Sequence, residues 1–338
     1  MNAALTAREL VLSSRPRGRI EPECFTLVER DLSAPKRGQL LIRADCFSVD
    51  PSMIPRLSVD TYARAFDLGT PVEARSVGQV VRSTADGWSE GDWAVCWGGW
   101  RDHAIVDAGE AVRIEPRAGL PPHTWLHVLG APGLTAYLGL VDVARIRPGD
   151  RVWVSAAAGA VGSVAAQLAK IRGASLVIGS AGGAGKARYL TDTLGLDAAV
   201  DYRAGGLAEQ LRAAAPEGID VYFDNVGGDH LEAAIGLMRT GGRAAICGMI
   251  SGYGKPPQPG PANLTQLIVK RLRLEGFLVL DHLHRRAAFE EEVLPLVEDG
   301  TLHSDVTAFD GLESAPRALL SLLDGEKLGK ALVRPRPD

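Results

Sequence analysis

The stretch RVWVSAAAGAVGSVAAQLAK, from Arg151 to Lys170, decides the fold. Its first residues, Val152–Val154, are typical of a short buried strand, and a turn that contains two glycines follows at Gly159–Gly162. A helix-like segment then runs to Lys170 without a charged residue. This order suits the pyrophosphate of a dinucleotide, because backbone N–H groups and the helix dipole favour an anion at such a helix N-terminus.

The glycine motif is incomplete, because Ala157 occupies the first glycine position of G-x-G-x-x-G. Gly162 would let the helix pack close to the strand, and Gly159 would let the backbone approach a phosphate. Taken alone, the same residues also suit a buried helix whose small side chains permit close packing. The uncharged run Val152–Ala169 has the length of a membrane span. Its alanine-rich composition, interrupted by Gly and Ser, argues against one.

The composition is that of an ordinary globular protein. The chain has 338 residues, of which 46% are hydrophobic and 23% charged, and this length predicts two domains. A net charge of −4 gives no reason to expect nucleic acid or an anionic membrane as a partner. The N-terminus has no apolar core of signal-peptide length. Dispersed cysteines predict reduced thiols in a cytoplasmic protein; they are Cys24, Cys46, Cys96 and Cys247.

Two patterns divide the chain. Up to about Leu126, short β-branched runs such as Gln39–Val49 alternate with turn signals and predict an antiparallel β domain. From about His127, strands alternate with helices, which predicts an α/β fold with a parallel sheet covered on both faces. The expected strands are 151–155, 175–179, 198–200, 221–225, 243–247 and 274–280; the expected helices are 160–172, 186–193, 207–214, 229–239 and 288–300.

The last residues are typical of strand, helix and strand, and we expect them to return to the first domain. The predicted domains are therefore 1–126 with 301–338, and 127–300.

The segment GSAGGAGKARYL, Gly179–Leu190, bears on the choice of dinucleotide. NAD-specific sites place an acid after the second strand, where it binds the ribose hydroxyls. Here Lys186 and Arg188 stand instead, and Tyr202 ends the next strand. A cation in this loop suits the 2′-phosphate of NADP, although solvated surface charge would give the same pattern.

Two further strand ends carry small residues. In DVYFDNVGG, Asp220–Gly228, an apolar strand ends at Asn225 before two glycines, so the backbone can lie against a ligand. A strand end followed by a helix cap would look the same. In ICGMISGYG, Ile246–Gly254, Tyr253 could reach a cofactor or be an ordinary loop aromatic.

With these motifs in order, the chain resembles the zinc-free branch of the medium-chain dehydrogenase/reductase superfamily, above all the prostaglandin reductases and alkenal double-bond reductases. The resemblance covers nearly the whole chain. It implies a GroES-like antiparallel β domain, a Rossmann domain with a doubly wound parallel sheet, and NADPH-dependent reduction of the double bond of α,β-unsaturated carbonyl compounds. The matching stretches are Leu129–Leu140, Ser155–Ser163, Tyr222–Gly228, Cys247–Gly254, Asn263–Val279 and Leu328–Val333.

The resemblance also implies roles for individual residues. The turn Gly159, Ala160, Val161 and Gly162 would bind the pyrophosphate, and Lys186 and Tyr202 would bind the 2′-phosphate of NADP(H). The resemblance further implies a homodimer. The rest of the cofactor would be lined by Asn225, Cys247, Tyr253 and the backbone of Phe277, Leu278 and Val279.

Zinc is not expected. Zinc-dependent relatives carry a G-H-E motif, but the corresponding stretch Ala74–Val81 is ARSVGQVV, which has no His or Glu. Neither the cysteines nor the histidines have the spacing of a metal site. We therefore expect no metal ligands in this chain.

Three positions depart from the family pattern. Ser52, in DPSMIPRL, stands where the family has a tyrosine, Val269 replaces a pocket tyrosine of plant relatives, and Lys327 replaces a cofactor-contacting asparagine. Hydride transfer to the β carbon places negative charge on the carbonyl oxygen, which needs hydrogen-bond donors. The candidates are Ser52, Tyr253 and the ribose hydroxyl of the cofactor, and we rank that hydroxyl first. A quinone reductase and a weakly catalytic NADPH-binding regulatory module remain as alternatives.

Overall fold

The computed structural model describes residues 5–115, 117, 119–256, 259–325 and 327–336. The chain forms two units, which are described separately. The first unit comprises Met1–Leu126 and Val306–Asp338, and the second comprises His127–Asp305. The chain thus returns to the first unit at Val306, slightly later than the boundary at 300/301 that the sequence suggests.

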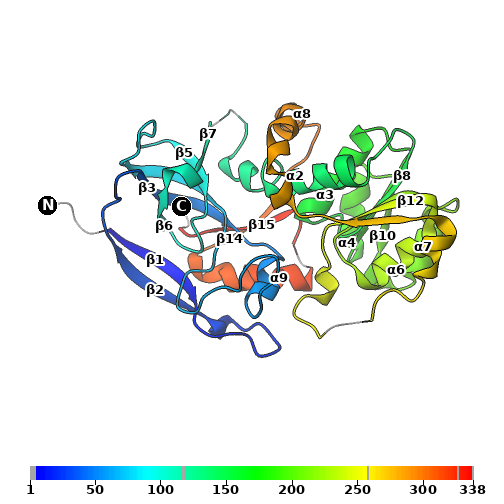
Figure 1. Cartoon of the computed structure of the whole chain (residues 1–338), viewed down its shortest axis with the longest axis horizontal. Helices are drawn as coiled ribbons and strands as arrows, with labels where there is room; N and C mark the ends of the chain where they lie inside the picture. Colours follow the sequence, from blue (N-terminus) through cyan, green and yellow to red (C-terminus); the bar gives the residue numbers. More distant parts are fainter. Residues whose placement is uncertain (1–4, 116, 118, 257–258, 326, 337–338) are drawn as a thin grey trace. The chain divides into compact units, whose positions relative to one another are not determined.

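The first unit is built on β-sheet (Figure 1). A seven-stranded sheet has the order β14-β15-β3-β4-β5-β7, with β6 paired to β3, and β1 and β2 form a separate antiparallel pair. The strands are β1 (Leu5–Leu12), β2 (Phe25–Leu32), β3 (Gln39–Ser48), β4 (Ser76–Ser83), β5 (Trp93–Cys96), β6 (His103–Asp107), β7 (Val112–Ile114), β14 (Val306–Asp310) and β15 (Lys330–Arg334).

The expectation of an antiparallel domain needs one correction, because β14 and β15 pair in parallel. Helix α9 (Ala315–Asp324) connects them, and a parallel pair requires such a crossover. The short helices of this unit are α1 (Met53–Arg56), η1 (Pro22–Cys24), η2 (Ala108–Glu110), η3 (Pro122–Leu126) and η9 (Leu312–Ser314).

The second unit contains a six-stranded, fully parallel sheet in the order β10-β9-β8-β11-β12-β13. Its strand order reverses between β8 and β11, and ligands of open α/β sheets bind at the carboxyl ends beside such a reversal. The strands are β8 (Arg151–Val154), β9 (Leu176–Ala181), β10 (Ala198–Asp201), β11 (Ile219–Asp224), β12 (Met238–Ile246) and β13 (Arg273–Gly276).

Helices connect these strands (Figure 1). They are α2 (Ala131–Leu138), α3 (Ala160–Ile171), α4 (Ala184–Arg188), α5 (Leu207–Ala214), α6 (Gly228–Leu237), α7 (Thr265–Lys270) and α8 (Arg286–Glu298). Two π-helical turns, η4 (Gly139–Val143) and η5 (Tyr189–Thr193), extend α2 and α4, and the 3-10 segments are η6 (Tyr202–Ala204), η7 (Ile250–Gly252) and η8 (Val279–Arg285).

The six expected strands of this unit are confirmed in number and order, but the strand predicted at 274–280 is too long. The five expected helices are present, whereas α2 and α7 were not predicted. β13 ends at Gly276, and a 3-10 segment begins at Val279. The ring of Phe277 packs edge-on against Phe223 of β11, with ring centroids 6.4 Å apart. The apolar run continues past Gly276 because the partly buried Phe277 packs against Phe223, and this run resembles a longer strand.

An aromatic row crosses the second unit from its core to its surface. Trp153 of β8 and Tyr222 of β11 are fully buried, with ring centroids 4.5 Å apart. His230 of α6 stacks on Trp153 at 5.8 Å, and Tyr202 meets the edge of His230 at 5.4 Å. We call Tyr222, Trp153, His230 and Tyr202 the aromatic row. Burial lowers the pKa of His230 from 6.5 to about 4, so the imidazole is neutral near pH 7.

This depressed pKa predicts a loss of stability in acid. Between about pH 6.5 and about pH 4 the unfolded chain binds a proton at His230 that the folded chain does not. The free energy of unfolding should therefore fall as the pH drops through this window, and it should fall less in His230→Phe. Urea unfolding of both proteins at several pH values measures the difference. His123, whose pKa burial also lowers, contributes equally to both proteins. Identical pH profiles would contradict the prediction.

Candidate functional site

The N-terminus of α3 packs very closely against the turn that follows β8. A Cβ atom at Gly162 would lie 2.3 Å from the carbonyl oxygen of Ala156 and 2.9 Å from the Cα of Ala157. Ala156 has a φ of 49°, and the turn is tied to β9 by a 2.9 Å bond from Ala157 N to Ser180 O. Gly159, the N-cap, has no side chain with which to cap the first turn. An external acceptor can take that place, so this turn fits a pyrophosphate.

A buried histidine supports the same turn. His127 is fully buried, with Nε2 3.0 Å from the carbonyl oxygen of Ala160 and Nδ1 3.0 Å from the hydroxyl of Ser304. Because a carbonyl can only accept, Nε2–H donates to Ala160 and Nδ1 accepts from Ser304. The sequence analysis did not identify His127, because Ser304 lies far away along the chain.

Asp224 organises the end of β11. Its carboxylate Oδ1 accepts bonds from the Tyr222 hydroxyl at 2.8 Å and from the N–H groups of Val226 and Gly227 at 2.9 Å. Burial raises the pKa of Asp224, although these N–H groups oppose the shift. Asp224 thus holds the turn before α6, but it does not cap that helix, whose N-cap is Gly227 without a side-chain bond. Its neighbour Asn225 bonds β8 instead, donating Nδ2–H to Ser155 O at 2.7 Å and its N–H to Ser155 Oγ at 2.8 Å.

The ends of β9 and β10 form the corner at which a 2′-phosphate is expected. Asp201 Oδ1 accepts from Gly183 N at 2.7 Å and from Arg203 N at 3.0 Å, which ties the two loops together. A Cβ at Gly182 would lie 2.7 Å from the Tyr202 hydroxyl and 2.9 Å from Arg203 Nε. Lys186 lies on α4, in the same loop region. We call Gly182, Lys186, Tyr202 and Arg203 the phosphate corner.

Arg203 was missed in the sequence, although it directly follows Tyr202. Asp201 is the acid nearest to this corner along the chain, and its Oδ1 already accepts two backbone N–H groups. The corner therefore presents two cations and a phenol, a set that suits a dianionic phosphate.

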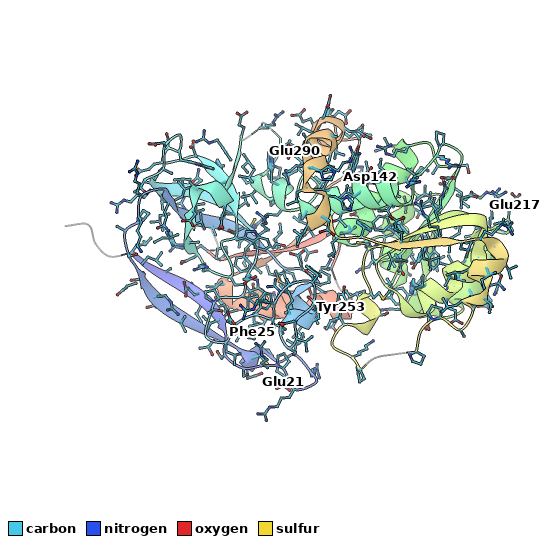
Figure 2. The ribbon with its side chains drawn as sticks, in the orientation of Figure 1. Glu21, Phe25, Asp142, Glu217, Tyr253 and Glu290 are labelled. Atoms are coloured by element: carbon cyan, nitrogen blue, oxygen red, sulfur yellow. The ribbon has the colours of Figure 1, made fainter. Side chains whose placement is uncertain are left out.

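The loop after β12 brings Cys247 and Tyr253 to the same edge of the sheet. The N–H groups of Cys247 and Gly248 donate to the carbonyl oxygen of Asp224 at 2.8 and 3.0 Å. The Tyr253 hydroxyl would lie 3.6 Å from a Cβ at Gly248, so the phenol lies close to the end of β12. Tyr253 is labelled in Figure 2. Burial, with the Asp224 charge, raises the pKa of Cys247 to about 12 and keeps it a thiol.

The segment Phe277–Val279 follows β13 at the same end of the sheet. The side chain of Phe277 packs inward, since a Cβ at Gly139 would lie 2.9 Å from its ring. Leu278 is 37% exposed. The structure thus brings the expected cofactor residues of the second unit to the carboxyl ends of one parallel sheet.

In the first unit, Ser52 is the N-cap of α1, and its hydroxyl makes no capping bond to that helix. The preceding turn is held by Lys330, whose side chain is only 1% exposed. Lys330 Nζ donates to Val49 O at 2.8 Å and to Asp50 Oδ1 at 2.7 Å, while the Ser48 hydroxyl donates to Asp50 Oδ2. Although burial opposes the shift, the Lys330 ammonium holds the pKa of Asp50 below its usual value.

The structure also describes the two other positions that depart from the family pattern, Lys327 and Val269. Lys327 Nζ donates to Gly329 O at 2.8 Å. Val269 lies on α7 and is 63% exposed, as part of an apolar surface in the second unit.

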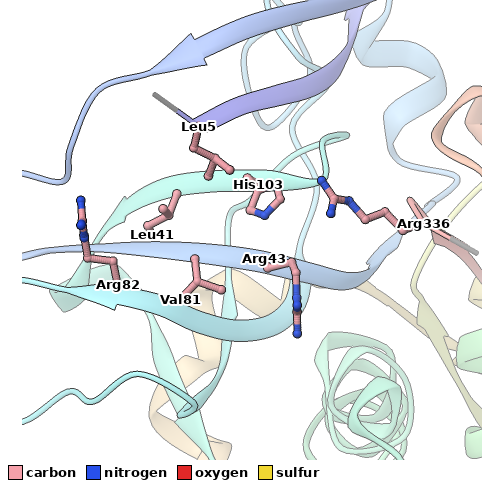
Figure 3. Close-up of a pocket in the computed structure, with 7 residues that line it drawn as sticks. All are labelled: Leu5, Leu41, Arg43, Val81, Arg82, His103 and Arg336. Carbon is pink, nitrogen blue, oxygen red and sulfur yellow. The ribbon is translucent and has the colours of Figure 1, made fainter. Parts of the chain in front are cut away.

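A separate pocket of about 420 Å³ lies in the first unit (Figure 3). In this pocket Arg43 donates to Gln79 at 2.9 Å, and Arg336 donates to Asp102 at 2.9 Å. None of the predicted site residues lines it. The lining residues are Leu5, Leu41, Arg43, Val81, Arg82, His103 and Arg336.

The described residues provide neither a cluster of metal ligands nor a membrane-spanning helix. Within those ranges, no group of three or more His, Cys, Asp or Glu side chains could hold a metal ion. No helix there is long and apolar enough to span a membrane.

Comparison with known proteins identifies the family. The zinc-binding dehydrogenase family matches residues 160–299, and the N-terminal domain of oxidoreductase family matches residues 8–114. The chain is 38% identical to the NADPH-dependent curcumin reductase of Escherichia coli, over 97% of this chain and 96% of that protein. It is 38% identical to mouse prostaglandin reductase 1, over 92% of this chain and 93% of that protein.

A solved structure agrees over almost the full length. The crystal structure of CurA in complex with NADPH from Vibrio vulnificus has a TM-score of 0.91 and 37% identity, covering 98% of this chain and 100% of that chain. Together with the parallel sheet and its glycine turn, these matches show that the chain belongs to the zinc-free branch of the medium-chain dehydrogenase/reductase superfamily that contains the prostaglandin and alkenal double-bond reductases.

Proposed function

We propose that this chain is an NADPH-dependent reductase of the carbon–carbon double bond in α,β-unsaturated carbonyl compounds. The observation that carries the proposal is the phosphate corner, where the Tyr202 hydroxyl and Arg203 Nε lie next to Gly182 and where α4, which carries Lys186, begins two residues later. The names of the curcumin and prostaglandin reductases support the reaction class. The CurA complex supports the cofactor.

Within this proposal, the residues of the second unit hold NADPH along the carboxyl edge of the sheet. Gly159, Ala160, Val161 and Gly162 bind the pyrophosphate through backbone N–H groups and the helix dipole. The phosphate corner binds the 2′-phosphate. The nicotinamide half is lined by Asn225, Cys247, Tyr253 and the backbone of Phe277, Leu278 and Val279.

NADPH supplies the hydride, which adds to the β carbon of the conjugated substrate. The carbonyl oxygen would then carry negative charge, and the candidate donors to it are the ribose hydroxyl of the cofactor, which we rank first, Ser52 and Tyr253. Cys247 stays protonated because burial raises its pKa to about 12. A neutral thiol is a poor nucleophile, so Cys247 can line the site without adding to an electrophilic substrate.

We further propose a cytoplasmic homodimer. β13 is the last strand in the order of its sheet, and an uncovered edge invites pairing. The neighbouring helix α7 exposes Ile268 by 81% and Val269 by 63%, which a second copy would cover.

The first prediction concerns the cofactor. A charge-assisted hydrogen bond contributes about 1.5–3 kcal/mol, so Lys186→Ala should lower kcat/KM for NADPH about ten- to hundredfold and leave NADH nearly unchanged. The measurement is cofactor oxidation with a simple enone. Lys36→Ala, at an exposed lysine of the first unit, is the control. Equal efficiency of the unmodified protein with NADPH and NADH would contradict the prediction.

The second prediction concerns the donor to the substrate oxygen. The Ser52 hydroxyl is shorter than the tyrosine of the family, so Ser52→Ala should lower kcat by less than about tenfold. Loss of a principal transition-state donor costs roughly a hundredfold or more. A loss of that size in Ser52→Ala would make Ser52 the main donor. The same loss in Tyr253→Phe, with NADPH affinity intact, would assign the role to Tyr253.

The third prediction concerns assembly. Light scattering at micromolar concentration should give the mass of two chains, and Ile268→Glu should shift it toward one chain by placing a charge on the apolar surface. A monomeric unmodified protein would rule out the dimer.

A further inference from the structure

Tyr202 lies on a very short helical segment, which by itself does little to fix the phenol ring. It opens η6, a 3-10 segment of three residues, and its side chain lies at the surface, with the residue 39% exposed. Its ring meets the edge of His230 at a centroid distance of 5.4 Å and an interplanar angle of 75°. His230 comes from α6, after β11, which is separated from β10 by two strands in the sheet.

We propose that His230 is a positioning residue for cofactor choice: it holds the ring of Tyr202 in the phosphate corner, and thereby favours a 2′-phosphorylated dinucleotide. This role rests on the proposed function, and it concerns a residue that the family motifs do not include.

The ring of His230 is in turn held by the buried aromatic side chains of the sheet. Its ring stacks on Trp153 at 5.8 Å and 23°, and Trp153 packs on Tyr222 at 4.5 Å. Trp153 and Tyr222 belong to the central strands β8 and β11 and are fully buried. The aromatic row therefore connects the phenol of Tyr202, on a short surface segment, to buried side chains of the central strands. This packing restricts the movement of the Tyr202 ring.

The contact acts through packing, not through charge. His230 Nε2 is buried and has no hydrogen-bond partner among the residues that the structure describes. Because burial keeps the imidazole neutral near pH 7, it offers no positive charge to a phosphate. The charge of the corner comes from Lys186 and Arg203, and His230 orients the phenol of Tyr202, which lies with Arg203 beside Gly182.

This division of roles sets the size of the expected effect. Removing the ring of His230 frees Tyr202 but leaves Lys186, Arg203 and the bonds of Asp201 in place. An aromatic contact of this kind changes affinity by about two- to tenfold. The loss should be confined to ligands that carry a 2′-phosphate.

The test uses two small ligands and no substrate. Calorimetry would measure the affinity of the full chain for 2′,5′-ADP, which carries the 2′-phosphate, and for 5′-AMP, which lacks it. His230→Ala and His230→Leu should weaken 2′,5′-ADP by about two- to tenfold and leave 5′-AMP unchanged, whereas His230→Phe should keep the unmodified affinity. Leu fills the space without a ring, which keeps the test valid if His230→Ala fails to fold. His284→Ala, at an exposed histidine, is the control.

A double-mutant comparison separates positioning from general stability. If His230 acts through Tyr202, then adding His230→Ala to Tyr202→Ala should cost no further affinity for 2′,5′-ADP. The proposal is overturned if the unmodified protein prefers 2′,5′-ADP and His230→Leu keeps that preference, or if both ligands weaken equally. A protein that reduces no enone but shows the predicted ligand pattern would refute the proposed reaction and leave the role of His230 standing.

Discussion

The second unit depends on the contact between Gly162 and the backbone of Ala156. A side chain at this position would lie 2.3 Å from a carbonyl oxygen, so only glycine allows α3 to begin where it does. Since α3 begins there, its N-terminus points at the carboxyl edge of β8, next to the reversal of strand order. The strand ends near which the other expected cofactor residues lie share one edge of the sheet, because all of its strands are parallel.

Buried polar groups then fix the loops at that edge. Asp224 accepts the N–H groups of the turn after β11, and His127 bonds the first turn of α3. In the first unit, Lys330 and Asp50 form a comparable pair beside Ser52. Removing one member of such a pair would leave a buried polar group without its partner, which costs far more than the net value of the bond. These loops are thus held rigid before any ligand arrives, and preorganisation of this kind favours transition-state stabilisation.

The sequence was most informative where the physical signal is local. The order of strand, glycine turn and helix at 151–170 predicted β8, the turn and α3, which the structure confirms. The 2′-phosphate site at the cation of the following loop stays a prediction. The sequence did not predict the contacts of His127, of Lys330 or of the aromatic row. Their partners are distant in the chain, and no spacing rule connects them. Ser304 and His127 are in contact although they lie near opposite ends of the sequence of the second unit. Asp50 and Lys330 are in contact although nearly the whole chain separates them in sequence. The end of β13 was misjudged because the inward ring of Phe277 continued an apolar run beyond the strand.

The central claim, that this chain reduces conjugated carbonyl compounds with NADPH, is tested most directly by one assay. The purified protein would be mixed with NADPH and, in turn, a panel of enones, enals and quinones, while the absorbance of the cofactor and the product of each reaction are followed. We predict oxidation of NADPH with enones and enals, with one saturated carbonyl product formed for each cofactor consumed. Turnover of the quinones alone, or of no compound in the panel, would contradict the account.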